Sequence, residues 1–161
     1  MFFVGGVGMP HARNLRKGRF SGNNQIYLVT SVTEQRRKVF ADFYLARIVV
    51  DALRFQHKQE HVESLAFVVM PDHFHWLFVL KNDYSLAKVM QGVKGRSSRA
   101  AKLMQPSCGV KGVLWQEGYH DHALRKEEDI LQVARYIVAN PLRAGLVKSL
   151  GTYPFWDAVW L

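Results

Sequence analysis

The feature that most constrains the fold is an apolar hairpin over residues 68–80, in which two apolar runs flank a Pro-Asp pair that is followed by His-Phe-His. Pro71 and Asp72 favour a turn, so the two runs are predicted to pair as adjacent strands. Side chains alternate between the faces of a strand, which places His73 and His75 on the same face. The opposite face carries Phe74, Trp76, Phe78 and Leu80. We expect this aromatic face to enter a hydrophobic core.

The histidine pair has two interpretations. Alternate positions on a strand are about 6–7 Å apart at Cα, which is close enough for the two imidazoles to bind one metal ion. In the other interpretation, one histidine caps the turn and the second packs against its neighbours. The hairpin alone leaves both open, because a metal site needs a further ligand from another segment.

The charge of the chain indicates the class of its partner. The 161 residues include 22 Lys and Arg against 13 Asp and Glu, which gives a formal net charge of +9. This excess favours a polyanion, and nucleic acid is the first candidate. A hydrophobic content of 48% is sufficient for one core. We predict a flexible basic arm at residues 1–22 and a single domain at residues 23–161.

Cysteine usage and hydropathy indicate the compartment. The single cysteine, Cys108, excludes an intramolecular disulfide framework and fits a reducing cytosol. The longest apolar stretch, residues 65–80, contains Pro, Asp and His residues and is too short to span a bilayer. Residues 1–8 are apolar but lack the basic start of a signal peptide. We therefore expect a cytoplasmic protein that does not bind membranes.

Basic residues gather in three segments. They are Arg13, Arg16, Lys17 and Arg19 near the start, Arg36 and Arg37 after a predicted strand, and Lys88, Lys94, Arg96, Arg99 and Lys102 on a predicted helix. The first segment has no periodicity and is either a solvated tail or an arm that binds phosphates. The helix has Ser85 as its N-cap and no acidic residue among its basic ones. We therefore favour binding to a DNA backbone over simple solvation of this helix face.

The remaining pattern predicts an α+β fold. β-branched and aromatic residues at 26–33 indicate a strand, and apolar residues at helical spacing indicate helices at 41–57 and 85–104. Residues 61–70 form the first strand of the hairpin, and residues 113–125 are ambiguous but strand-like. The order of strand, helix, two strands, helix and strand predicts an antiparallel sheet of the split β-α-β kind.

The last predicted helix supplies candidate partners for the histidines. It runs from Lys126 to Asn140, with acidic residues at its start and Pro141 after its end. Its polar stripe comprises Asp129, Gln132, Tyr136 and Asn140. Tyr136 and Asn140 are one turn apart, with Cβ atoms about 5–6 Å from each other, so an ion bound by the Asn140 carbonyl would lie beside the phenolic oxygen. Taken alone, Tyr136 has the simpler interpretation of an aromatic residue at the edge of the core.

Several motifs together match a known family. They are Tyr27-Leu28-Val29-Thr30 with Arg36-Arg37, Met70-Pro71-Asp72-His73-Phe74-His75, Trp115-Gln116, Tyr119-His120-Asp121-His122, and Tyr136-Ile137-Val138-Ala139-Asn140-Pro141. On these motifs the chain resembles the single-tyrosine HUH transposases of the IS200-like class, and specifically their REP-associated branch. The resemblance implies a ferredoxin-like HUH endonuclease domain, and residues 1–8 have no counterpart in it.

The resemblance also implies roles for individual residues. His73 and His75 would be metal ligands, Asn140 the third ligand, and Tyr136 the nucleophile on single-stranded DNA. His122 and Gln132 are expected to support the active site without a specific chemical role. A hard divalent cation, Mg²⁺ or Mn²⁺, suits two imidazoles and an amide oxygen and would polarise a phosphodiester.

These roles predict a metal-dependent transposase that cleaves and rejoins single-stranded DNA through a 5′-phosphotyrosine, with REP-type hairpins as substrates. Two other functions stay open. One is a catalytically silent protein that binds a specific DNA or RNA sequence, and the other is a metal-dependent phosphoesterase in which the histidines activate water. We expect the protein to act at the nucleoid of a prokaryote, as a monomer or a homodimer.

Overall fold

The computed structural model describes residues 24–81, 83–104, 111–125 and 129–159. The predicted basic arm at residues 1–22 lies outside these segments, and so do Arg13, Arg16, Lys17, Arg19, Cys108 and Lys126. None of the helices in the described segments is long and apolar enough to cross a membrane.

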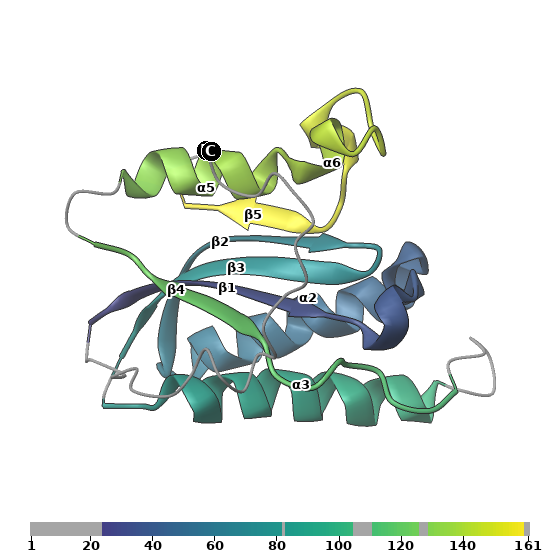
Figure 1. Cartoon of the computed structure of the whole chain (residues 1–161), viewed down its shortest axis with the longest axis horizontal. Helices are drawn as coiled ribbons and strands as arrows, with labels where there is room; N and C mark the ends of the chain where they lie inside the picture. The colour runs from purple at the N-terminus through teal and green to yellow at the C-terminus, as the bar shows by residue number, and fades with distance from the viewer. Residues whose placement is uncertain (1–23, 82, 105–110, 126–128, 160–161) are drawn as a thin grey trace.

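Within the described residues, five strands form one antiparallel sheet in the order β4-β1-β3-β2-β5 (Figure 1). The strands are β1 (Ile26–Val32), β2 (Val62–Met70), β3 (His73–Leu80), β4 (His120–Ala123) and β5 (Trp156–Ala158). The order β4-β1-β3-β2 is that of the ferredoxin-like sheet, which confirms the predicted fold class. β5 was not predicted, and it extends the sheet beyond β2.

Helices cover both faces of the sheet (Figure 1). α2 (Phe43–Lys58) and α3 (Leu86–Leu103) pack on one face, and α5 (Ile130–Val138) packs on the other, followed by the short α6 (Asn140–Arg143). The units β1-α2-β2 and β3-α3-β4 start from strands that run in opposite directions, and they cross the sheet in opposite directions. Crossovers of the same hand therefore place α2 and α3 on the same face.

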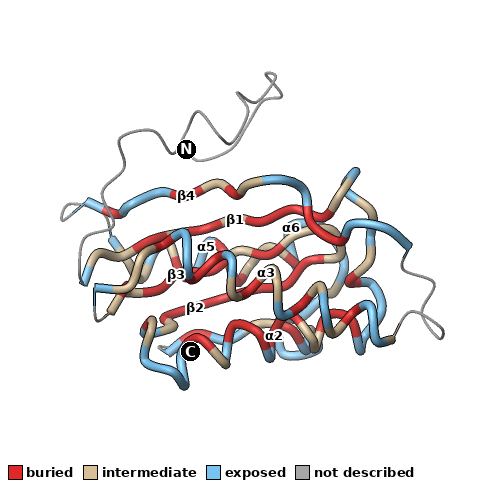
Figure 2. The backbone as a smooth tube through the Cα atoms, turned by 90° about the horizontal axis from the view of Figure 1, so that it is seen from below, coloured by how far each residue is buried: buried red, intermediate tan, exposed pale blue. Residues whose placement is uncertain are grey.

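The two faces have separate hydrophobic cores. Phe74, Trp76 and Phe78 of β3 are fully buried against the α2/α3 side, as the alternation of the hairpin predicted. Leu77 of the same strand packs instead with Ile137 and other residues of α5. Figure 2 shows buried residues concentrated along the central strands, while the helices alternate between buried and exposed residues.

The start of α3 confirms the predicted N-cap. The Ser85 side chain accepts a hydrogen bond from the Lys88 backbone N–H at 3.2 Å. Farther along, Ser97 is buried in the apolar stripe because its hydroxyl donates to the Val93 carbonyl oxygen and accepts from the Trp115 indole N–H. A polar residue is therefore accommodated within this core without an unsatisfied group.

The segment before β4 differs from the prediction. Residues 113–125 were predicted to be strand-like, but β4 spans only His120–Ala123. The Lys94 ammonium donates to the carbonyl oxygens of Gln116 and Gly118 at 2.6 and 2.7 Å, so a neighbouring strand is not needed to satisfy these groups. Hydrogen bonds from one lysine side chain to backbone carbonyl oxygens leave no periodic pattern in the sequence.

The last helix is also shorter than predicted. It spans Ile130–Val138, and Asp129 caps it by accepting a hydrogen bond from the Gln132 N–H at 3.1 Å. The helix ends before Pro141, as predicted, but its predicted last residue, Asn140, is wrong: Pro141 lies in the first turn of α6, where its missing N–H has no helical partner to lose. Asn140 therefore begins α6 and is not the last residue of the preceding helix.

Candidate active site

The turn that carries the two histidines is held by the segment that follows β1. The Thr33 N–H donates to the Asp72 carbonyl oxygen, and the Phe40 N–H donates to the Pro71 carbonyl oxygen, each at 2.9 Å. The Arg36 guanidinium also forms an ion pair with the Asp72 carboxylate at 3.4 Å. Both residues of the turn are therefore anchored, which fixes the start of β3.

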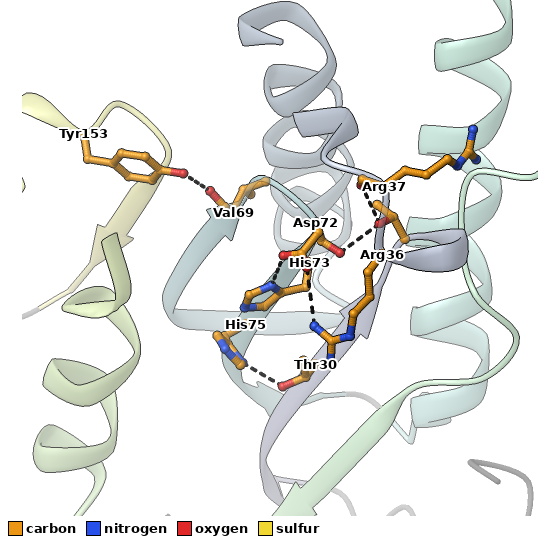
Figure 3. A network of polar contacts seen from close by, with 9 residues as sticks. Thr30, Arg36, Arg37, Val69, Asp72, His73, His75 and Tyr153 are labelled. Carbon is orange, nitrogen blue, oxygen red and sulfur yellow. Dashed lines mark hydrogen bonds and ion pairs between the residues drawn. The ribbon is translucent and has the colours of Figure 1, made fainter. Parts of the chain in front are cut away.

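His73 and His75 lie side by side on one face of β3, as predicted. Their ring centroids are 4.9 Å apart, with the rings at 80° to each other. His73 Nδ1 is 2.6 Å from a carboxylate oxygen of Asp72, and His75 Nδ1 is 2.7 Å from the hydroxyl of Thr30 (Figure 3). Each imidazole thus has its Nδ1 engaged by a neighbour, which orients the ring and leaves Nε2 as the atom to bind a ligand.

Electrostatics favour the neutral form of His75. Burial, the neighbouring His73 and the positive charge of Arg143 lower the pKa of His75 to about 3. Burial by itself raises the pKa of Asp72, but the hydrogen bond and charge of His73, together with Arg36, outweigh it and lower this pKa. The site therefore combines an ionised Asp72 carboxylate with a neutral His75 imidazole. The neutral imidazole is the form of histidine that binds metals.

Tyr136 is exposed on α5, with 42% of its surface accessible. The Arg143 guanidinium lies over its ring, 3.9 Å from the ring centroid. The same guanidinium donates from Nη2 to Oδ1 of Asn140. Asn140 Nδ2 is buried without a hydrogen-bond partner among the described residues. Arg143 therefore links Tyr136 to Asn140, a role that the sequence patterns did not reveal.

Arg143 also connects these two residues to the histidines. Its charge is among the causes that lower the pKa of His75, so the guanidinium lies within electrostatic range of that imidazole. α6 contacts β2, the strand that pairs with β3 (Figure 1). His73, His75, Tyr136 and Asn140 thus belong to one region of the α5 face of the sheet.

Of the residues predicted to support the site, Gln132 is exposed one turn before Tyr136. Strand register distinguishes His122 from His120. Thr30 pairs with His75 on one side and with His120 on the other, whereas His122 pairs with Leu28. His120 therefore shares a row with His75 across the sheet, and His122 lies two residues farther along β4. Strand alternation puts the two histidines on one face of β4 but carries no information on the register of β4 against β1.

The predicted DNA-binding residues divide into two groups. Lys88, Arg99 and Lys102 are exposed on α3. The other described ones contact groups of the protein: Arg37 the carbonyl oxygens of Lys111 and Val113, Lys94 two carbonyl oxygens, and the exposed Arg36 and Arg96 the Asp72 carboxylate and, at 4.0 Å, the Phe55 ring. Because α3 covers the face opposite to the histidines, its exposed cations lie on the other side of the sheet from Tyr136.

A metal ion would need ligands of mixed type here. No group of three or more His, Cys, Asp or Glu side chains is placed to hold a metal within the described residues. Two imidazoles and the Oδ1 atom of Asn140 form a donor set that suits a divalent cation. The hydrogen bond from Arg143 does not prevent this, because a carbonyl oxygen has two lone pairs. The residues therefore fit the ion that the resemblance implies.

Comparison with known proteins gives a consistent set of matches. The family described as "Transposase IS200 like" matches residues 21–140. A REP-associated tyrosine transposase of Escherichia coli is 31% identical over 94 residues, which are 58% of this chain and 52% of that protein. A Haemophilus influenzae protein named for the same class is 26% identical over 144 residues, which are 81% of this chain and 77% of that protein.

The matches extend to solved structures. One structure, of a REP-associated tyrosine transposase bound to a REP hairpin, is similar with a TM-score of 0.69 and 24% identity, and covers 86% of this chain and 79% of that chain. This likeness shows that the two proteins share a fold. The match to the E. coli protein spans about half of that relative's length, 52%.

Proposed function

The chain belongs to the IS200-like transposase family, and we propose that it cleaves and rejoins single-stranded DNA with Tyr136 as its nucleophile. The observation that carries this proposal is the position of Tyr136. Its exposed ring is held against Arg143, and Arg143 lies within electrostatic range of His75. A DNA strand that reached Tyr136 would therefore also reach the histidine pair.

The proposed reaction exchanges one phosphodiester for another. Tyr136 Oη forms a bond to phosphorus, and the bond between phosphorus and the 3′ oxygen breaks. The phenolic proton is lost to solvent, and the released 3′ oxygen takes up a proton to become a hydroxyl. The 5′-phosphate stays on Tyr136, so a later attack by a 3′-hydroxyl rejoins DNA without ATP.

We propose Mg²⁺ or Mn²⁺ as the cofactor, with His73, His75 and Asn140 as its ligands. When bound, the cation would withdraw charge from a non-bridging phosphate oxygen and make the phosphorus a better electrophile. The protein's own part is to orient the ligands. Asp72 and Thr30 hold the two imidazoles through Nδ1, and the low pKa of His75 keeps that ring neutral at physiological pH.

The proposed substrate is a DNA hairpin with single-stranded flanks. The solved relative bound to a REP hairpin supports this choice, and so does the net charge of +9. An exposed tyrosine on a helix reaches a flexible single strand more easily than a phosphate within a duplex. We also propose that the protein acts in the cytoplasm of a prokaryote, at the nucleoid.

Covalent capture tests this function. The probe is a labelled oligonucleotide that contains an imperfect palindrome found beside the protein's own gene, with single-stranded 5′ and 3′ flanks. The protein is incubated with this probe and Mg²⁺ and then run on a denaturing gel. We expect a protein–DNA adduct with the wild type and none with Tyr136→Phe, which removes one oxygen.

Tyr119→Phe is the matched control. Tyr119 is buried in the α2/α3 core, with 6% of its surface exposed, so this variant should still form the adduct. An adduct that persists in Tyr136→Phe would assign the nucleophile to another residue. Cleavage without any adduct would identify a phosphoesterase, and hairpin binding without cleavage would identify a silent binding protein.

A further inference from the structure

Arg143 is an exposed residue whose side chain contacts both Tyr136 and Asn140. It lies at the end of α6, outside the segment matched by the family, residues 21–140. The central carbon of its guanidinium lies over the Tyr136 ring, and Nη2 donates to Asn140 Oδ1. An exposed cation–π contact contributes little to stability. Its two partners are the proposed nucleophile and a proposed metal ligand.

The charge of Arg143 is not neutralised by a neighbouring acid. No carboxylate forms an ion pair with this guanidinium in the part of the chain that the structure describes. A guanidinium has five N–H donors, and a cation–π contact with a ring does not use them as hydrogen-bond donors. One donor is bonded to Asn140. The remaining donors are therefore able to bind an anion beside Tyr136.

The nearby charges also favour an anion at this position. Arg143 lies within electrostatic range of His75, a ligand of the proposed divalent cation. The guanidinium and that cation would repel each other unless an anion lay between them. A phosphodiester supplies oxygens that a guanidinium binds with two parallel hydrogen bonds.

We propose that Arg143 binds the phosphate that Tyr136 attacks, while its guanidinium holds the Tyr136 ring and the Asn140 amide beside that phosphate. This inference rests on the proposed function of Tyr136. The attack on phosphorus increases the negative charge on the non-bridging oxygens. A fixed guanidinium at that position stabilises the transition state more than the bound substrate.

Three variants test the proposal in a single-turnover adduct assay at saturating hairpin. Arg143→Gln should lower the rate of adduct formation by about 100-fold or more, the usual effect of removing one donor to a developing charge. Arg143→Lys keeps the charge but loses the planar fork, so its rate should fall between Arg143→Gln and the wild type. Arg135→Gln removes the neighbouring exposed charge on α5 and should stay within about threefold of the wild type.

Measuring the affinity for the hairpin distinguishes a role of Arg143 in positioning one phosphate from a role in general DNA binding. In a Tyr136→Phe background, which keeps the ring and blocks cleavage, Arg143→Gln should weaken binding by less than about tenfold, because many other cations still bind the DNA phosphates. A wild-type adduct rate in Arg143→Gln would overturn the proposal. Equally slow adduct formation in Arg143→Gln and Arg135→Gln would overturn it as well, since it would reflect local charge alone.

A second readout does not depend on cleavage. The Nε–H signal of Arg143 in an NMR spectrum, assigned by its loss in Arg143→Lys, should shift when a single-stranded oligothymidylate is added with Mg²⁺. The Arg135 signal should shift less. An Arg143 signal that does not move would overturn the proposal even if the wild type forms an adduct. A wild type that forms no adduct, with an Arg143 signal that moves, would instead count against the function proposed for Tyr136.

Discussion

The two faces of the sheet differ in how completely helices cover them. α2 and α3, of 16 and 18 residues, cover one face and bury its aromatic residues completely. α5 has only nine residues and covers the other face at Leu77, while His73 and His75 lie nearer the turn of the hairpin. The shorter helix leaves room for polar side chains at one end of the sheet. A single strand, β3, thereby contributes to the core on one face and to the candidate active site on the other.

The difference between the two faces predicts which substitutions change stability and which change activity. Substitutions on the α2/α3 face should change stability, and substitutions near the turn on the α5 face should change activity with little loss of stability. The largest effect is expected from Trp76→Ala. Trp76 is fully buried, and its indole N–H donates to the Ser64 hydroxyl at 3.0 Å. The free energy of unfolding, measured by urea denaturation, should fall by about 3–5 kcal/mol.

The control is Trp76→Phe, which keeps much of the ring volume and should cost less. If Trp76→Ala left the urea midpoint unchanged, the α2/α3 face would not be the main core of the domain.

On the other face, His75→Ala should lower the rate of adduct formation by about 100- to 1,000-fold, because it would remove a ligand of the proposed metal ion. Excess EDTA should have the same effect on the wild type. The urea midpoint of His75→Ala should move much less than that of Trp76→Ala. Full adduct formation in EDTA would contradict the proposed metal site.

The exposed cations of α3 provide a test of whether bound DNA reaches both faces. A triple variant, Lys88→Gln with Arg99→Gln and Lys102→Gln, should reduce the slope of log affinity against log salt by about 0.7–0.9 for each phosphate that the protein no longer neutralises. The stability of the fold should change little, because all three side chains are exposed.

Lys94 provides the matched control on the same helix. Its ammonium is bonded to two carbonyl oxygens, so Lys94→Met should destabilise the domain and leave the salt slope nearly unchanged. A triple variant with the wild-type slope would restrict DNA binding to other parts of the protein.

The smallest effect is expected from Tyr153→Phe. The Tyr153 hydroxyl donates to the Val69 carbonyl oxygen at 2.6 Å, and its removal should cost about 1 kcal/mol. Burial raises the pKa of Tyr153 from 10.0 to about 12. The unfolded chain therefore ionises first, so this group's contribution is fully present below pH 10 and is lost as the pH rises toward 12.

Urea denaturation at pH 8 and at pH 11 checks this prediction. The difference in stability between the wild type and Tyr153→Phe should shrink at the higher pH. A difference that stays constant or grows would show that ionisation of Tyr153 is not linked to unfolding.

Features that depend on local backbone geometry could be predicted from the amino-acid pattern. Strand alternation placed His73 and His75 on one face and Trp76 on the other, and helical periodicity with Ser85 located α3. The same periodicity placed Tyr136 on an exposed stripe. These patterns repeat every two residues or every 3.6, so a short window of sequence contains them.

Contacts between distant groups depended on the packing of the folded chain and could not be predicted. The register of β4 against β1 put His120, rather than His122, in the row of His75. The packing of α3 made Lys94 an internal donor, and the break after Val138 brought Arg143 over Tyr136. Such contacts depend on how separate elements pack together. The sequence pattern around a lysine or arginine does not show whether its charged group lies in water, on a carbonyl oxygen or over an aromatic ring.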